Sequence, residues 1–218
     1  TESLFAGGKG TELAEYLQAL CEGYLLAGYR YQDLAKDTPK KEGADFQPEG
    51  LSLLGVRGSG MEKSVLRAQI LAEAVNVARG LGDRPGNFLT PSDLGDLVSK
   101  MAKEKGVKCT VWGRKEIEKE KMGLFLGVAR GSAEEPKFII LDYQGGKKGE
   151  KPIVLVGKGV TFDSGGLSLK PSDRMEDMKY DMMGAAAVAG IFHALGELKI
   201  SQNVLGFIPT TENMPGGR

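Results

Sequence analysis

The charged residues with the clearest chemical potential lie in one segment, between residues 151 and 181. The apolar run Ile153–Val156 predicts a short buried strand, and two lysines and two aspartates follow it: Lys158, Asp163, Lys170 and Asp181. In open α/β sheets, ligands bind outside the carboxyl ends of the strands. Charged groups in such a place need partners, because isolated buried charges are costly. The simplest arrangement is a divalent cation held by the two aspartates.

Each of these four residues also has a purely structural interpretation. Asp163 precedes Ser-Gly-Gly and could form an Asx-turn, and Asp181 could cap the helix expected over 184–198, which would stabilise it by about 1 kcal/mol. Lys158 could form an ion pair with Asp163, because an ammonium group has no lone pair for a metal. Lys170 could lie on the surface, as most lysines do. The spacing by itself favours these structural interpretations.

Two segments resemble a known family. They read VGKGVTFDSGGLSLKPSDRMEDMKYDMMGAAAV (156–188) and TENMPGGR (211–218). Both are similar to signature motifs of the leucyl aminopeptidase family, the two-metal cytosol aminopeptidases. The resemblance is strong from Ala78 to Arg218 and weak before Leu51.

The resemblance implies a role for five residues. Lys158, Asp163 and Asp181 would ligate metal, Lys170 would be catalytic, and Met178 would line the pocket for the first side chain of the substrate. Lys158 would bind as a neutral amine, a form that burial and a neighbouring divalent cation both favour. Lys170 would stay charged and donate to the carbonyl oxygen as negative charge develops there. For Met178, a place in the core is the alternative.

The activity implied by the resemblance is the release of N-terminal residues, leucine and similar, from peptides with a free N-terminus. Two divalent ions, Mn²⁺ or Zn²⁺, would activate a water molecule. In the family a bicarbonate ion, held by an arginine, acts as base. The family also forms hexamers in the cytoplasm, so we expect a cytoplasmic homo-oligomer.

One motif of the family has no counterpart in this sequence. The motif Asn-Thr-Asp-Ala-Glu-Gly-Arg carries the remaining Asp and Glu ligands and the arginine, and it should follow TENMPGGR; Arg218 belongs to that earlier motif and does not replace the arginine. We therefore expect a part of a longer enzyme that is inactive by itself. The alternative is a non-catalytic folding or assembly fragment of such an enzyme.

Other hydrolase classes fit the sequence poorly. Asp163-Ser164-Gly165-Gly166 is similar to the nucleophile loop of trypsin-like proteases, but that chemistry needs a histidine base. The chain has a single histidine, His193, inside a predicted helix. An aspartic protease needs two Asp-Ser-Gly copies, whereas one is present. Gly157-Lys158-Gly159 lacks the remainder of a phosphate-binding loop.

Composition excludes further classes. The chain has 218 residues, with 29 lysines and arginines against 29 aspartates and glutamates. This balance gives no support for nucleic-acid or membrane-surface binding. No apolar run is long enough to span a membrane. Two cysteines, Cys21 and Cys109, indicate reduced thiols in place of a disulfide framework.

The elements that would position these residues form an α/β pattern. We expect a largely parallel, mixed sheet with helices on both faces. Residues 1–56 would be the C-terminal part of a smaller α/β N-terminal domain with its linker, and 57–218 the N-terminal portion of the catalytic domain. The predicted helices are 12–30, 64–81, 90–105, 115–121 and 184–198. The predicted strands are 51–56, 107–112, 124–128, 138–143, 153–156 and 204–208.

Overall fold

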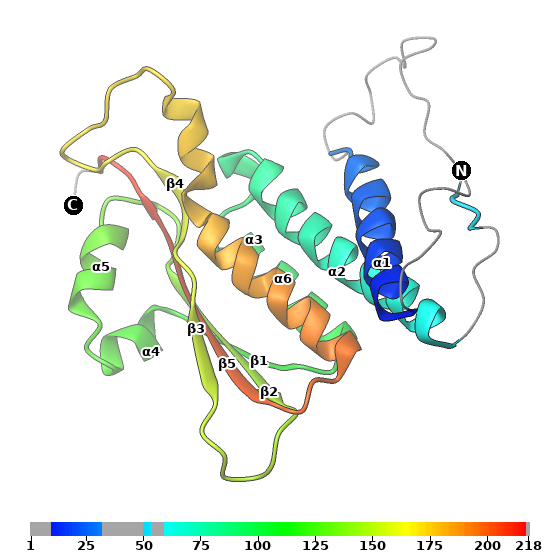
Figure 1. The fold of residues 1–218 in the computed structure, drawn as a ribbon. Coiled ribbons are helices and arrows are strands. Elements are labelled where there is room, and N and C mark those ends of the chain that lie inside the picture. The colour runs from blue at the N-terminus through cyan, green and yellow to red at the C-terminus, as the bar shows by residue number, and fades with distance from the viewer. Residues whose placement is uncertain (1–9, 32–49, 54–58, 217–218) are drawn as a thin grey trace. The chain divides into compact units, whose positions relative to one another are not determined.

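The computed structural model describes residues 10–31, 50–53 and 59–216 (Figure 1). The chain divides into two compact units, Thr1–Asn76 and Val77–Arg218, with the boundary inside a long helix. The division expected at residue 56, between parts of two family domains, stays a prediction.

The first unit contains helix α1 (Gly10–Ala27) and most of helix α2 (Ser59–Asp83), so both helices predicted there are confirmed. Leu17 and Cys21 of α1 pack with Ala68 of α2 in a small buried cluster. Partly buried apolar residues surround this cluster: Leu53, Met61 and Val65. Of the strand predicted over 51–56, residues 51–53 are not strand, and residues 54–56 lie outside the described residues.

The second unit is built on a five-stranded mixed sheet. Its strands are β1 (Lys108–Trp112), β2 (Lys137–Gln144), β3 (Ile153–Val156), β4 (Gly159–Asp163) and β5 (Asn203–Asn213). The order is β1-β2-β5-β3, and β4 also pairs with β5. The β1–β2 and β2–β5 pairings are antiparallel, whereas β3 and β4 both run parallel to β5. The predicted α/β fold with a mixed sheet is confirmed.

Helices cover both faces of this sheet, as predicted. In Figure 1, α4 and α5 lie on one side of the strands, and α3 and α6 lie on the other. The helices are α3 (Pro91–Glu104), α4 (Arg114–Lys119), α5 (Gly123–Ala129) and α6 (Met183–Leu198), with 3₁₀ segments η2 (Gly86–Phe88) and η3 (Met175–Met182). No helix in the described part of the chain combines the length and the apolar composition that a membrane span needs.

The main core lies between the sheet and helices α3 and α6. Its fully buried members include Leu94, Ile139, Leu141, Phe192 and Ile208. Helix α6 is rich in alanine and glycine, which lets its backbone approach the strands closely. Phe192 then fills the space over Gly206 of β5, where an added Cβ would lie 2.5 Å from the ring.

Three sequence predictions in this unit are wrong. Strand β3, predicted to be buried, is largely exposed, with Ile153 53% and Val156 70% exposed, because it lies at an edge of the sheet. Residues 124–128, predicted as a strand, belong to helix α5, because a short apolar run does not distinguish a strand from a helix. Its Phe125 ring packs edge-on against Phe138 of β2, 6.4 Å between ring centroids. Residues 159–163, predicted as loop, form strand β4. Its pairing extends β5 to Asn213, past the predicted end at 208.

Candidate functional site

Close backbone contact between the end of β3 and the start of α6 positions Lys158. The Gly157 amide donates to Phe207 O at 2.9 Å, and the Ala185 amide of α6 donates to Lys158 O at 2.9 Å. An added Cβ at Gly157 would overlap the Gly184 carbonyl group. Glycine at both positions therefore lets the strand end touch the helix start, which places Lys158 beside η3, the segment that contains Asp181.

Asp163 is the last residue of β4, and its two carboxylate oxygens face different partners. Oδ1 accepts from the Gly165 amide at 3.0 Å and from Asn213 Nδ2 at 2.7 Å. Oδ2 faces the two lysines. The Asx-turn considered from the sequence is therefore present, and it uses one oxygen while the other remains directed at the charged cluster.

The four charged side chains converge. Lys158 Nζ lies 3.0 Å from Asp181 Oδ1 and 3.7 Å from Asp163 Oδ2. Lys170 Nζ lies 3.1 Å from Asp163 Oδ2 and 3.3 Å from Asp181 Oδ2. Each amine thus contacts both carboxylates, although the four residues come from β4, η3 and the loops between elements.

This arrangement keeps Asp163 and Lys170 charged. Burial acts to raise the pKa of Asp163, but interactions with the side chains of Lys170, Asp181 and Asn213 and with the Gly165 amide, in that order, lower it to about 2. Burial acts to lower the pKa of Lys170, but its hydrogen bonds to Asp163 and Asp181 and their negative charges raise it above its ordinary value. Ionised carboxylates are the form that a metal ion requires.

The structure also shows where Asp181, Lys170 and Met178 lie, for which the sequence allowed a purely structural role. Asp181 belongs to η3, and the N-cap of α6 is Met182 without a side-chain cap, so Asp181 does not cap that helix. Lys170 turns toward the acids, with 35% of its side chain exposed. Met178 Sδ lies 3.0 Å from Lys170 Nζ, so Met178 belongs to the same cluster.

The donor set fits part of a metal site. Among the described residues there is no group of three or more histidine, cysteine, aspartate or glutamate side chains that could hold an ion. The cluster does hold two carboxylates, those of Asp163 and Asp181, and the oxygens that face into it contact the lysine amines. The amine of Lys158 is the third candidate ligand. Carboxylate oxygens with a nitrogen donor suit hard or borderline divalent cations.

Ser164 and His193 are placed differently from a nucleophile and its base. Ser164 is buried, and its hydroxyl donates to Asn213 O at 2.7 Å, while its amide donates to the same oxygen at 2.9 Å. His193 is buried in α6. The Ser164 hydroxyl therefore ties the end of β4 to the end of β5 by a main-chain hydrogen bond.

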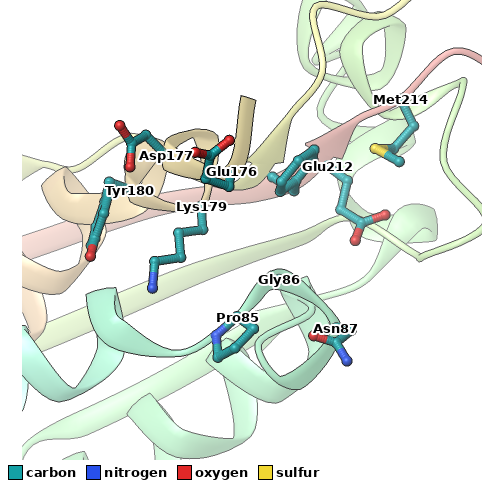
Figure 2. Close-up of a pocket in the computed structure, with 10 residues that line it drawn as sticks. Pro85, Gly86, Asn87, Glu176, Asp177, Lys179, Tyr180, Glu212 and Met214 are labelled. Carbon is teal, nitrogen blue, oxygen red and sulfur yellow. The ribbon is translucent and has the colours of Figure 1, made fainter. Parts of the chain in front are cut away.

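A pocket of about 680 Å³ lies near the cluster and was not predicted from the sequence. Figure 2 shows its walls: one side carries Pro85 and Asn87, another carries residues of η3, and Glu212 and Met214 come from the end of β5 and just beyond. Phe162, which also lines it, precedes Asp163, and adjacent strand residues point to opposite faces. The pocket and the charged cluster thus take residues from the same elements, β4 and η3, but none of the four charged residues lines the pocket.

Sequence reasoning also missed Asn213. Its amide group contacts Asp163 because β4 and β5 pair in register, with Asp163 opposite Asn213. The signal available in the sequence was its place in TENMPGGR, the second of the two segments that resemble the family.

Comparison with known proteins gives consistent results. Residues 76–218 match the profile of the cytosol aminopeptidase family, catalytic domain. A probable cytosol aminopeptidase of Aromatoleum aromaticum is 45% identical over 210 residues, which are 95% of this chain and 42% of that protein. One from Paraburkholderia phymatum is 51% identical over 154 residues, 71% of this chain and 31% of that protein.

The chain is also similar to solved structures. The bottromycin maturation enzyme BotP, in complex with Mn, matches with a TM-score of 0.78 and 35% identity, covering 94% of this chain and 41% of that one. The chain therefore spans about two-fifths of the length of the first relatives it matches, 42% and 41%. The profile covers the segment that carries the charged cluster, the two relatives are 45% and 51% identical to this chain, and the fold matches a solved structure, so the chain belongs to the cytosol aminopeptidase family.

Proposed function

We propose that the whole protein containing this chain is a metal-dependent aminopeptidase that releases N-terminal residues, leucine and similar, from peptides. The observation that carries the proposal is the convergence of Lys158, Asp163, Lys170 and Asp181 within 3.0–3.7 Å contacts, inside the segment that matches the family's catalytic domain. Aminopeptidase is also the activity in the names of the curated relatives.

Asp163, Asp181 and Lys158 would bind the metal in this proposal. Divalent ions bound there would polarise the substrate carbonyl group and make a water molecule more acidic, the two contributions of metal ions to hydrolysis. Mn²⁺ is the first ion to test, because the related BotP was solved in complex with Mn; Zn²⁺ is the second.

Lys170 and Met178 would bind neighbouring parts of the substrate. The carbonyl carbon and the side chain of an N-terminal residue are attached to the same Cα, so the groups that bind them must lie side by side. Lys170 Nζ and Met178 Sδ are 3.0 Å apart. The raised pKa of Lys170 keeps its ammonium charged, as a donor to a developing oxyanion must be.

The test uses the whole protein supplied with Mn²⁺ or Zn²⁺. We expect it to release leucine from leucyl-p-nitroanilide and from a leucyl peptide, and to leave an N-acetylated leucyl peptide intact. Asp163→Asn should lose activity and bound metal. Asp142→Asn is the matched control, because Asp142 lies on β2 and contacts Gln144 there. No release of leucine by the metal-loaded protein would refute the proposal.

The compartment and assembly follow the same proposal. The relatives are named cytosol aminopeptidases, and we propose a cytosolic homo-oligomer, a hexamer, for the whole protein. Fractionation of cells and mass photometry of the purified protein measure these two properties. A membrane-bound fraction or a stable monomer at assay concentration would contradict them.

A further inference from the structure

Asp163 needs a fixed orientation to present one oxygen to the cluster. A carboxylate at the end of a strand can rotate about its side-chain torsions, and each rotation would exchange or withdraw the oxygen that faces Lys158 and Lys170. In the structure, Oδ1 is occupied by two donors, the Gly165 amide and Asn213 Nδ2. Oδ2 is thereby left to face the lysines.

The chemistry of the contact determines which end of the Asn213 amide faces Asp163. An ionised carboxylate only accepts hydrogen bonds, so the group 2.7 Å from Oδ1 must be the NH₂ group. The short distance is typical of a charge-assisted hydrogen bond. The amide oxygen of Asn213 points to Gly166, where an added Cβ would lie 2.7 Å from it. Glycine at 166 therefore leaves the room that this amide orientation needs.

The backbone of Asn213 is also fixed by hydrogen bonds. Its carbonyl oxygen accepts from both the amide and the hydroxyl of Ser164, at 2.9 and 2.7 Å. Asn213 and Asp163 are also register partners in the parallel pairing of β5 with β4. Asn213 is thus attached to residues 163 and 164 by three hydrogen bonds, one of which reaches the carboxylate that would bind metal.

We propose that Asn213 is a positioning residue for the metal site: it holds Asp163 Oδ1 so that Oδ2 faces the ions. This inference rests on the proposed function, in which Asp163 is a metal ligand. Groups that bind the outer atoms of a metal ligand fix its orientation and tune its affinity, and their loss typically weakens metal binding or activity by 10–100-fold.

The experiment compares three variants in the whole protein. Asn213→Ala removes the donor, and Asn213→Leu removes it while keeping most of the side-chain volume. Asn203→Ala is the matched control: Asn203 is a buried asparagine at the other end of β5, and it bonds to Gly146, Lys147 and Glu150. We measure Mn²⁺ affinity by titration with electron paramagnetic resonance detection of free Mn²⁺, the Tm of each variant, and kcat as a function of Mn²⁺.

Both Asn213 variants should bind Mn²⁺ about 10–100-fold more weakly than the wild type, and a raised Mn²⁺ concentration should restore most of kcat. The Asn203 variant should have a lower Tm and an unchanged Mn²⁺ affinity. If Asn213 had a merely structural role, its variants would show the result expected for the Asn203 variant, a lower Tm with unchanged Mn²⁺ affinity. Unchanged Mn²⁺ affinity in a folded Asn213 variant would overturn the proposal.

A crystal structure of Asn213→Leu separates this inference from the proposed function. If the wild-type protein neither binds Mn²⁺ nor cleaves leucyl substrates, the aminopeptidase proposal fails. The positioning of Asp163 is still decided by the crystal structure. A rotated Asp163 carboxylate supports the positioning role of Asn213, and a carboxylate with Oδ2 still directed at Lys158 and Lys170 overturns it.

Discussion

The two lysines of the cluster differ in their contacts and in the exposed fraction of their side chains. Lys170 contacts Asp163, Asp181 and the Met178 sulfur, and 35% of its side chain is exposed. Lys158 contacts the same two acids, with 54% of its side chain exposed. The raised pKa of Lys170 favours a permanent cation there. A charged ammonium group suits a donor to an oxyanion, which supports that role for Lys170. The proposal of Lys158 as a metal ligand rests on the family resemblance, since burial favours a neutral amine and Lys158 is the more exposed of the two lysines.

Replacing Lys170 tests that role at the residue scale. Lys170→Gln should lower kcat of the metal-loaded whole protein by about 10²–10³-fold, the usual cost of removing a donor to an oxyanion, while metal stays bound. Steady-state kinetics with leucyl-p-nitroanilide, together with the metal content, measure the effect.

Lys105→Gln provides the control for that measurement. Lys105 forms a 2.6 Å ion pair with Glu197 at the end of α6. Its replacement should leave kcat unchanged. Equal losses in both variants would indicate a general effect on the fold and contradict a catalytic role for Lys170.

At the scale of elements, α3 begins with a complete capping box. The Thr90 hydroxyl accepts from the Asp93 amide at 3.2 Å, and the Thr90 amide donates to Asp93 Oδ2 at 2.9 Å. Pro91 occupies the first helical position, where its missing amide hydrogen costs nothing. The helix start was predicted from these residue types, since the signal is local.

Thr90→Ala should lower the free energy of unfolding by about 1 kcal/mol, because an amide at the helix start loses its acceptor. Urea denaturation followed by circular dichroism measures the change. Ser92→Ala is the control, since Ser92 takes no part in the capping box. If the two variants unfold at the same urea concentration, the cap contributes nothing to stability.

The contact between the end of β3 and the start of α6 gives a second prediction at this scale. Gly157→Ala places a Cβ against Gly184, so the helix start must shift. We expect a loss of about 1–3 kcal/mol in stability, typical of overpacking. We also expect weaker Mn²⁺ binding, since Lys158 and Asp181 would move apart.

Gly127→Ala is the matched control for that variant. Gly127 lies in α5, and an added Cβ there meets nothing within 4 Å. In a helix this change should stabilise by about 0.5–1 kcal/mol. Thermal unfolding and Mn²⁺ titration compare the pair. A Gly157 variant that behaves like the Gly127 variant would show that the close contact is unimportant.

At the scale of the whole molecule, the cluster has few metal ligands of its own. Two carboxylates and one candidate amine face each other, and the described residues contain no group of three acidic, histidine or cysteine ligands. Two-metal hydrolases use ligands for both ions. The chain of 218 residues matches 42% of the length of a relative that is named as an aminopeptidase.

We therefore expect the 218-residue chain by itself to lack aminopeptidase activity, whereas the whole protein is active. Both are assayed at equal molar concentration with leucyl-p-nitroanilide and Mn²⁺, and circular dichroism checks that the chain is folded. A folded chain that cleaves the substrate at a rate near that of the whole protein would contradict the expectation.

Local signals made much of this protein predictable. Helix α3, strand β3 and helix α6 were predicted within two residues of their ends, because caps, apolar runs and small-residue composition act over short distances. Helix α5 was predicted as a strand, since a short run of four apolar residues and one glycine fits both structures. Strand β4 was predicted as a loop, because its strand character depends on pairing with β5.

The sequence by itself determined the kind of groups at the site: two acids and two lysines after an apolar strand, in an order similar to that of one family. Only the tertiary structure decided that both acids face both lysines, and that Asn213 occupies one oxygen of Asp163. The reason is physical. Residue types and short-range spacing are properties of a segment, whereas the distance between Asp163 and Asn213 depends on which strands pair and in what register.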